Sequence, residues 1–208
     1  MKFKWYAIKL VIICVVVYIL QFIIQDLTNE FALVSSEVLY RPWTIVTSIF
    51  LHAPDYPPHL IYNIFALALF GSVLEKIIGG KNFLIIFFAS GIVASFGSIL
   101  FYTASIGASG AIFGVMGALA ALRPRMTIFI GYVPMPMALA IVFWAIINFA
   151  GLFSPDEIAY AVHLFGLGFG LVAGFYLRKW YGEKRMKGKK HRISEEEFRK
   201  WEDRWMII

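Results

Sequence analysis

Apolar residues occupy six long runs of the chain, and the shorter segments between the runs hold most of the charged side chains. A transmembrane helix needs about 20 mostly apolar residues to cross roughly 30 Å of hydrocarbon. The runs approach or reach that length except for the fourth, so the pattern predicts an all-α bundle of six transmembrane helices. The predicted helices are Trp5–Ile24, His59–Ile78, Phe83–Tyr102, Ser109–Leu122, Thr127–Phe149 and Ile158–Leu177.

The remaining segments predict a membrane domain over residues 1–178 and a basic tail over residues 179–208. The first run is longer than a signal-peptide core and no cleavage pattern follows it, so we interpret it as a retained helix. The 25–58 connection mixes apolar and charged residues, as interfacial helices do. In the tail, Ser194 and Glu197 form a capping-box pattern before an aromatic face, which predicts a short amphipathic helix.

Composition supports a membrane protein, because 60% of residues are hydrophobic, only 15% are charged and the mean hydropathy is +0.75. Soluble domains carry about 25% charged residues. Eight Lys and Arg lie between Arg178 and Arg192, so the net charge of +6 is better explained by anionic lipid than by nucleic acid. Cys14 is the single cysteine, so no intrachain disulfide is expected, and no metal site or cofactor is predicted.

Charge also predicts the orientation of the helices, because cytoplasmic loops are enriched in Lys and Arg. The connections after the first, third and fifth runs are acidic and hold Arg41 as their one basic residue. The other connections and both termini are basic. Both termini are therefore predicted to be cytoplasmic, and the 25–58 connection is predicted to be an external loop.

Ser109 lies between Gly107 and Gly110 at the start of the fourth run. Polar groups at membrane depth are costly and often functional. The backbone N–H groups at a helix start can also bind a developing oxyanion. The alternative is a small-residue packing motif between helices.

His163 lies early in the sixth run, and Gly166 and Gly170 follow on the same helical side. That smooth side can approach the glycines of the fourth helix and bring His163 close to Ser109. A serine is a weak nucleophile until a base accepts its proton, so the pair favours nucleophilic catalysis over a structural histidine.

His59 and Asn63 are four residues apart, so both side chains share one face of the second helix. They suit either an oxyanion hole or a polar clamp between helices. No carboxylate falls in this zone, so a Ser–His dyad without an acid is expected. Phe113, one turn after Ser109, either stacks under the imidazole or belongs to the core.

With these motifs the chain resembles the rhomboid family of intramembrane serine proteases. The matches are G-x-S-G around Ser109, H-x-x-x-N from His59 to Asn63, and H-x-x-G-x-x-x-G beginning at His163. Two departures are Arg41-Pro42-Trp43 where the family often has Trp-Arg, and Phe113 where it often has Tyr.

The resemblance implies cleavage of single-pass transmembrane proteins near the outer surface of the lipid bilayer. It implies Ser109 as nucleophile, His163 as general base and then acid, and an oxyanion hole from His59, Asn63 and the Ser109 amide. It also implies that the fifth helix is a lateral gate carrying Trp144, and that the chain is of the simple six-span type of prokaryotic cell membranes. The alternatives are a non-catalytic relative that binds membrane helices, and a small-solute channel.

Overall fold

The computed structural model describes residues 4–154 and 158–187. The fold is mostly helical, with two short pairs of strands. The elements in order are α1 (Tyr6–Ile23), α2 (Leu27–Phe31), β1 (Leu33–Val34), α3 (Thr44–Thr47), η1 (Ser48–Phe50), α4 (Pro57–Ala66), η2 (Leu67–Gly71), α5 (Ser72–Ile78), α6 (Gly80–Phe101), β2 (Ala104–Ser105), α7 (Ser109–Leu122), β3 (Thr127–Ile130), β4 (Val133–Pro136), α8 (Met137–Gly151) and α9 (Tyr160–Lys187). The amphipathic helix predicted for the tail lies outside the described residues.

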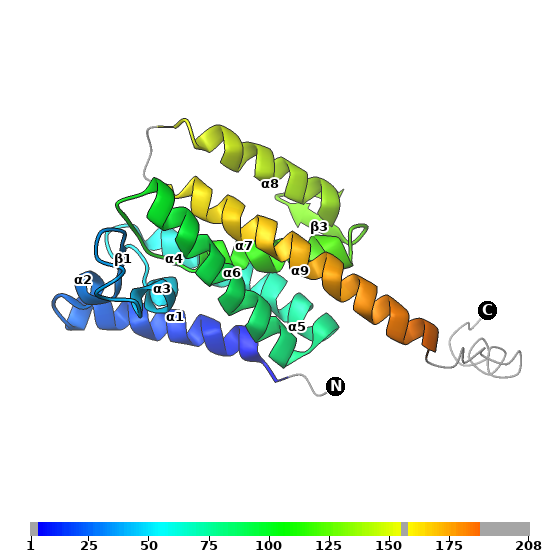
Figure 1. The fold of residues 1–208 in the computed structure, drawn as a ribbon, viewed down its shortest axis with the longest axis horizontal. Coiled ribbons are helices and arrows are strands. Elements are labelled where there is room, and N and C mark those ends of the chain that lie inside the picture. Colours follow the sequence, from blue (N-terminus) through cyan, green and yellow to red (C-terminus); the bar gives the residue numbers. More distant parts are fainter. Residues whose placement is uncertain (1–3, 155–157, 188–208) are drawn as a thin grey trace, which may run out of the picture.

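Within the described residues, four helices are long and apolar enough to cross a membrane. They are Tyr6–Ile23, Pro57–Ile78, Gly80–Phe101 and Tyr160–Lys179, and the second joins α4, η2 and α5 through the π-helical turn η2. The apolar helices α7 and α8 are shorter. Figure 1 shows α8 along one edge of the bundle and α1 along the opposite edge. Helices therefore occupy all six predicted runs, but only four reach the length of a full crossing.

The central helix is α7, because eleven of its fourteen residues are buried. Its glycines face those of α9, and three layers repeat at four-residue intervals. A Cβ on Gly166 would overlap the Gly110 carbonyl, one on Gly170 the Gly114 carbonyl, and one on Gly174 the Ala118 backbone. Residue numbers rise together on both helices, so α7 and α9 run parallel. Close backbone approach through small residues is a common way for membrane helices to associate.

The predicted fifth helix, Thr127–Phe149, is wrong over its first ten residues. The strands β3 and β4 form an antiparallel hairpin there, and α8 begins only at Met137. Gly131 opens the two-residue turn with a φ of +60°, a conformation that glycine adopts readily. Pro134 and Pro136 would break a helix interior, but both fit a strand in a two-stranded hairpin.

The 25–58 connection is structured by contacts to other elements. Strand β1 pairs with β2 just before α7, with Leu33 opposite Ser105. Arg41 forms ion pairs with Glu30 and Glu37 and donates to the Asn29 carbonyl. Arg41 therefore links the residues around α2 to one another. It precedes Trp43 by two residues, whereas the resembled family often has arginine directly after tryptophan.

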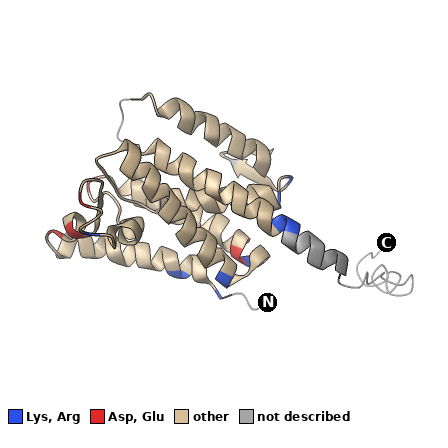
Figure 2. Cartoon of the chain, viewed as in Figure 1, with Lys and Arg blue, Asp and Glu red and all other residues tan. Residues whose placement is uncertain are grey.

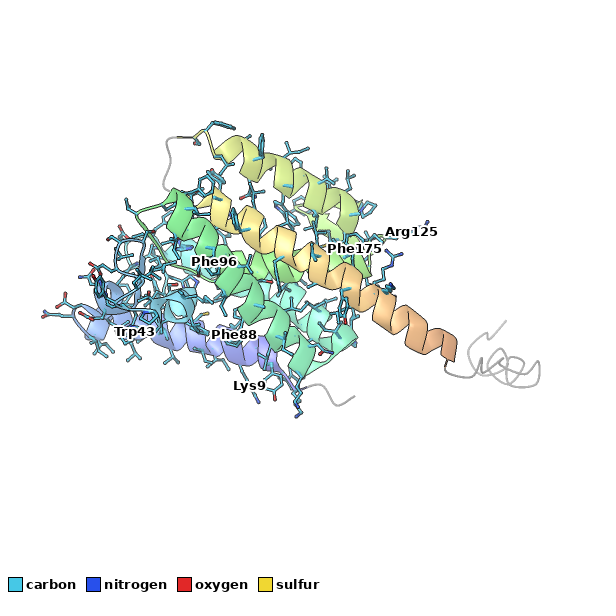
Figure 3. All side chains as sticks on the ribbon, viewed as in Figure 1. Lys9, Trp43, Phe88, Phe96, Arg125 and Phe175 are labelled. Atoms are coloured by element: carbon cyan, nitrogen blue, oxygen red, sulfur yellow. The ribbon has the colours of Figure 1, made fainter. Side chains whose placement is uncertain are left out.

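Charged side chains gather at opposite ends of the bundle. Figure 2 shows the acidic residues mainly around α2, whereas the basic ones lie mainly where α1 begins and around α5, the hairpin and α9. In Figure 3, Lys9 and Arg125 lie toward the basic end, and Trp43 lies at the acidic end near α2 and α3. The acidic and the basic connections noted in the sequence therefore lie mainly at opposite ends of the bundle.

Candidate active site

Ser109 is the first residue of α7, and the segment before it is held by backbone contacts. The Gly107 N–H donates to the Ser48 carbonyl over 2.9 Å. Gly107 has a φ of +120°, and a Cβ there would lie 2.7 Å from His59 Nε2. Position 107 therefore requires glycine both for its backbone conformation and for the space beside His59. The nucleophile candidate is thus presented by a tight turn into a buried helix.

His163 lies in the second turn of α9, and the glycine contacts between α7 and α9 bring it to Ser109. The distance from His163 Nε2 to Ser109 Oγ is 2.8 Å. A nucleophile and a base within about 2.6–3.2 Å can exchange a proton. The structure therefore brings together the two residues on which the sequence hypothesis depended, across 54 residues of chain.

The ring of Phe113 stacks against the imidazole of His163. The centroids are 4.4 Å apart and the planes differ by 13°. Phe113 also belongs to the residues packed against the core, so its stacking and core roles occur together. The contact restricts the tilt of the imidazole while leaving the ring nitrogens free to hydrogen bond.

Asn148 is a site residue that the sequence analysis missed. It lies near the end of α8, is 4% exposed, and its Oδ1 is 2.7 Å from His163 Nδ1. The available signal was an uncharged polar residue inside an apolar run, the same signal that drew attention to Asn63. Its contact with His163 was not visible, because the two residues lie on different helices.

His59 and Asn63 lie one turn apart on α4. The Ala53 N–H donates to His59 Nδ1, so a neutral His59 ring carries its hydrogen on Nε2, the atom beside Gly107. The amide of Asn63 is buried and donates to the His59 carbonyl over 2.7 Å. Among the described residues neither side chain has a hydrogen bond to Ser109, and it is His59 whose ring lies beside Gly107, two residues before the serine.

His52 supports His59 from the preceding loop. It is fully buried, and its ring meets the His59 ring edge-on at 5.1 Å. The side chain of Gln21 on α1 holds the His52 backbone by bonding both its N–H and its carbonyl. Burial, with the neighbouring His59 as a second cause, lowers the pKa of His52 from 6.5 to about 4. His52 is therefore a neutral packing partner near pH 7.

A small cavity opens beside Ser109 and is lined by hydroxyl and small side chains, including Ser48, Ser95 and Ser105. Trp144, the predicted gate residue, packs edge-on against Phe70 of η2, with ring centroids 6.2 Å apart.

Across the described part of the chain, no group of three or more His, Cys, Asp or Glu side chains could hold a metal ion.

Apolar helices of membrane length, packed around a hydrogen-bonded serine and histidine, define a helical integral membrane protein. The chain belongs to the rhomboid family, because residues 40–180 match the Rhomboid domain.

Individual relatives agree with this assignment. The Bacillus subtilis protein YdcA is 31% identical over 136 residues, 64% of this chain and 66% of YdcA. Mitochondrial rhomboid protein 1 of Saccharomyces cerevisiae is 30% identical over 162 residues, 73% of this chain and 46% of that protein. Rhomboid protease GluP of Bacillus subtilis is 44% identical over 78 residues, 37% of this chain and 15% of GluP. The matched part is less than two thirds of each relative, and the relatives include bacterial and mitochondrial proteins.

Proposed function

We propose that this chain is an intramembrane serine endopeptidase in which Ser109 is the nucleophile and His163 is the general base and acid. The observation that carries the proposal is the 2.8 Å contact between Ser109 Oγ and His163 Nε2 inside a bundle of membrane-length helices. Polar side chains at membrane depth are costly, and these two are half-buried and bonded to each other, which favours a chemical role.

The reaction begins when Ser109 Oγ attacks the scissile carbonyl carbon and its proton moves to His163 Nε2. The C–N bond then breaks, and His163 returns the proton to the leaving amine, which leaves an ester on Ser109. Water attacks the ester and gives a proton to His163. The ester bond breaks, the proton returns to Ser109 Oγ, and the product carboxyl group is released.

The tetrahedral intermediate needs donors for its oxyanion. The backbone N–H of Ser109 at the start of α7 supplies one. His59 Nε2–H and the remaining amide hydrogen of Asn63 are the other proposed donors, since the His59 ring lies next to Gly107 and Asn63 follows it by one turn of α4. These donors act most strongly in the transition state, where the charge is fully developed.

We propose that α7 and α8 complete a six-span topology with both termini in the cytoplasm. At 1.5 Å per residue, the 14 residues of α7 extend about 21 Å, which is less than the hydrocarbon thickness of about 30 Å. Ser109 then lies below the outer surface, shortly after β2, the strand that pairs with β1 of the 25–58 connection. The substrates are single-pass membrane proteins cleaved near that surface, and the compartment is a prokaryotic cell membrane.

The test is cleavage of a single-span substrate by purified protein in liposomes, comparing wild type, Ser109→Ala and the control Ser72→Ala. Ser72 lies at the start of α5, so its substitution makes the same chemical change away from the site. Cleavage and fluorophosphonate labelling should both disappear in Ser109→Ala and persist in Ser72→Ala. Wild-type protein that is folded yet neither cleaves nor labels would favour the non-catalytic alternative.

A further inference from the structure

The side chain of Asn148 is buried on a helix whose other residues are mostly exposed. Only Met137, Ala140 and Ile141 share its burial on α8. A buried amide is costly unless it is hydrogen bonded. Both ends of this amide have partners, since Nδ2 donates to the Trp144 carbonyl over 2.8 Å and Oδ1 faces His163 Nδ1 at 2.7 Å.

These contacts assign the donors and acceptors along the series from Trp144 through Asn148 and His163 to Ser109. The Trp144 carbonyl can only accept, so the nitrogen of the Asn148 amide faces it and the oxygen faces His163. His163 Nδ1 must then carry a hydrogen, and a neutral imidazole with a hydrogen on Nδ1 has none on Nε2. Nε2 is therefore the acceptor for the Ser109 hydroxyl. This tautomer is the one that a general base requires.

We propose that Asn148 is a positioning residue that holds His163 in the Nδ1–H tautomer with Nε2 directed at Ser109. The inference rests on the proposed function and extends it from a Ser–His dyad to a Ser–His–Asn arrangement. During acylation the serine proton moves to Nε2, while the Nδ1 hydrogen stays bonded to Asn148 Oδ1. The amide orients the imidazolium without contributing a negative charge.

The orientation of His163 then depends on how α8 packs. Trp144 supplies the carbonyl that fixes the Asn148 amide, and its own ring packs on Phe70 of η2. An outward movement of α8 would withdraw the Asn148 oxygen from His163. His163 therefore keeps the Nδ1–H tautomer and its orientation toward Ser109 only while α8 packs against the bundle and Asn148 contacts Nδ1.

The first experiment measures kcat and KM for Asn148→Leu, Asn148→Asp and Asn82→Leu. Asn82 is the matched control, because its amide donates to the Ile78 carbonyl in the same i to i−4 pattern at the start of α6. Asn148→Leu should lower kcat about 100-fold with little change in KM, as a misoriented base would. Asn82→Leu should stay within about twofold of wild type, because this half-buried amide bonds to Ile78 rather than to His163.

Asn148→Asp retains the acceptor oxygen and should recover most of the lost kcat. Its carboxylate favours the protonated imidazole, so the acid limb of its pH–rate profile should move to higher pH. A purely structural amide would not produce that shift. An equal loss of kcat in Asn148→Leu and Asn82→Leu, or an unshifted acid limb in Asn148→Asp, would overturn the proposal.

A second measurement is independent of activity and reads the tautomer in the wild-type protein. Nitrogen NMR of wild-type protein labelled with ¹⁵N-histidine, with the His163 signals assigned by comparison with His163→Ala, reports the tautomer directly. A hydrogen on Nδ1 is expected, and a hydrogen on Nε2 alone would refute the positioning role. Lack of Ser109-dependent cleavage in wild type would instead refute the proposed protease function and leave the tautomer result standing.

Discussion

The aromatic ring of Phe113 lies flat against the imidazole of His163, with centroids 4.4 Å apart and planes within 13° of each other. Phe113 is on α7, the helix that presents Ser109, so one helix supplies both the candidate nucleophile and the surface on which the base rests. Asn148 fixes the imidazole in its plane through Nδ1, and Phe113 fixes the tilt of that plane. The two contacts together leave the ring little freedom.

Phe113→Leu should therefore reduce kcat by about two- to tenfold, the range expected from losing an aromatic pair worth about 0.5–1.5 kcal/mol. Phe113→Tyr keeps the ring and should retain most of the activity. Phe88→Leu is the control, since Phe88 packs against Phe50 and Phe87 rather than His163. Equal losses in Phe113→Leu and Phe88→Leu would indicate a general core effect. Steady-state kinetics in liposomes distinguish the two results.

Ser109→Ala and His163→Ala should each abolish cleavage, and the double variant should be no worse than either single one. Members of a catalytic unit lose their contribution together, so their losses do not add. The comparison needs a sensitive cleavage assay and a melting curve for each variant to show that the fold is retained. If the two losses added in full, His163 would have a structural role instead.

His59→Ala and Asn63→Ala should each lower kcat by about 100-fold while KM changes little, because their donors engage charge that develops in the transition state. Both variants keep Ser109 and His163, so some fluorophosphonate labelling should remain. Tyr62→Ala is the control on the same helix, since Tyr62 is 70% exposed. A raised KM with unchanged kcat in both variants would mean that these side chains bind substrate or hold α4 in place.

Gly170→Ala should destabilise the protein far more than Gly168→Ala. A Cβ on Gly170 would overlap the Gly114 carbonyl, whereas a Cβ on Gly168 would meet nothing within 4 Å. Overpacking of this kind typically costs about 1–3 kcal/mol of stability. In thermal unfolding in detergent, Gly170→Ala should have a lower midpoint than wild type, and Gly168→Ala should not. Similar midpoints for the two variants would show that α7 and α9 separate without cost.

His52 should make the protein less stable as the medium is acidified. Its pKa is lowered by burial to about 4, so the stability contributed by the neutral ring is complete above pH 6.5 and is lost as pH falls toward 4. The unfolding midpoint of wild type should decline across that window, and His52→Gln, which does not titrate, should decline less. Parallel declines for both proteins would show that other groups control the acid response.

The sequence by itself determined where the helices lie. Ser109–Leu122 was predicted with the observed bounds, and the α1 and α6 regions within three residues at each end, because a transmembrane helix satisfies its backbone hydrogen bonds internally and its apolar length is readable locally. The pairing of Ser109 with His163 was also predictable, since glycines on one side of each helix indicate where two backbones can approach closely.

The β3–β4 hairpin replaced ten predicted helical residues, because prolines and a glycine turn, which are themselves local signals, outweighed apolar length there. Tertiary structure decided the composition of the site. Asn148 entered the site only because α8 packs with one residue against His163, and no local pattern encodes which face of a peripheral helix turns inward. The tautomer of His163 likewise depends on a carbonyl and an amide from another helix. Helix positions follow from local apolarity, whereas the donors and acceptors around the base follow from the register and rotation of helices that are distant in sequence.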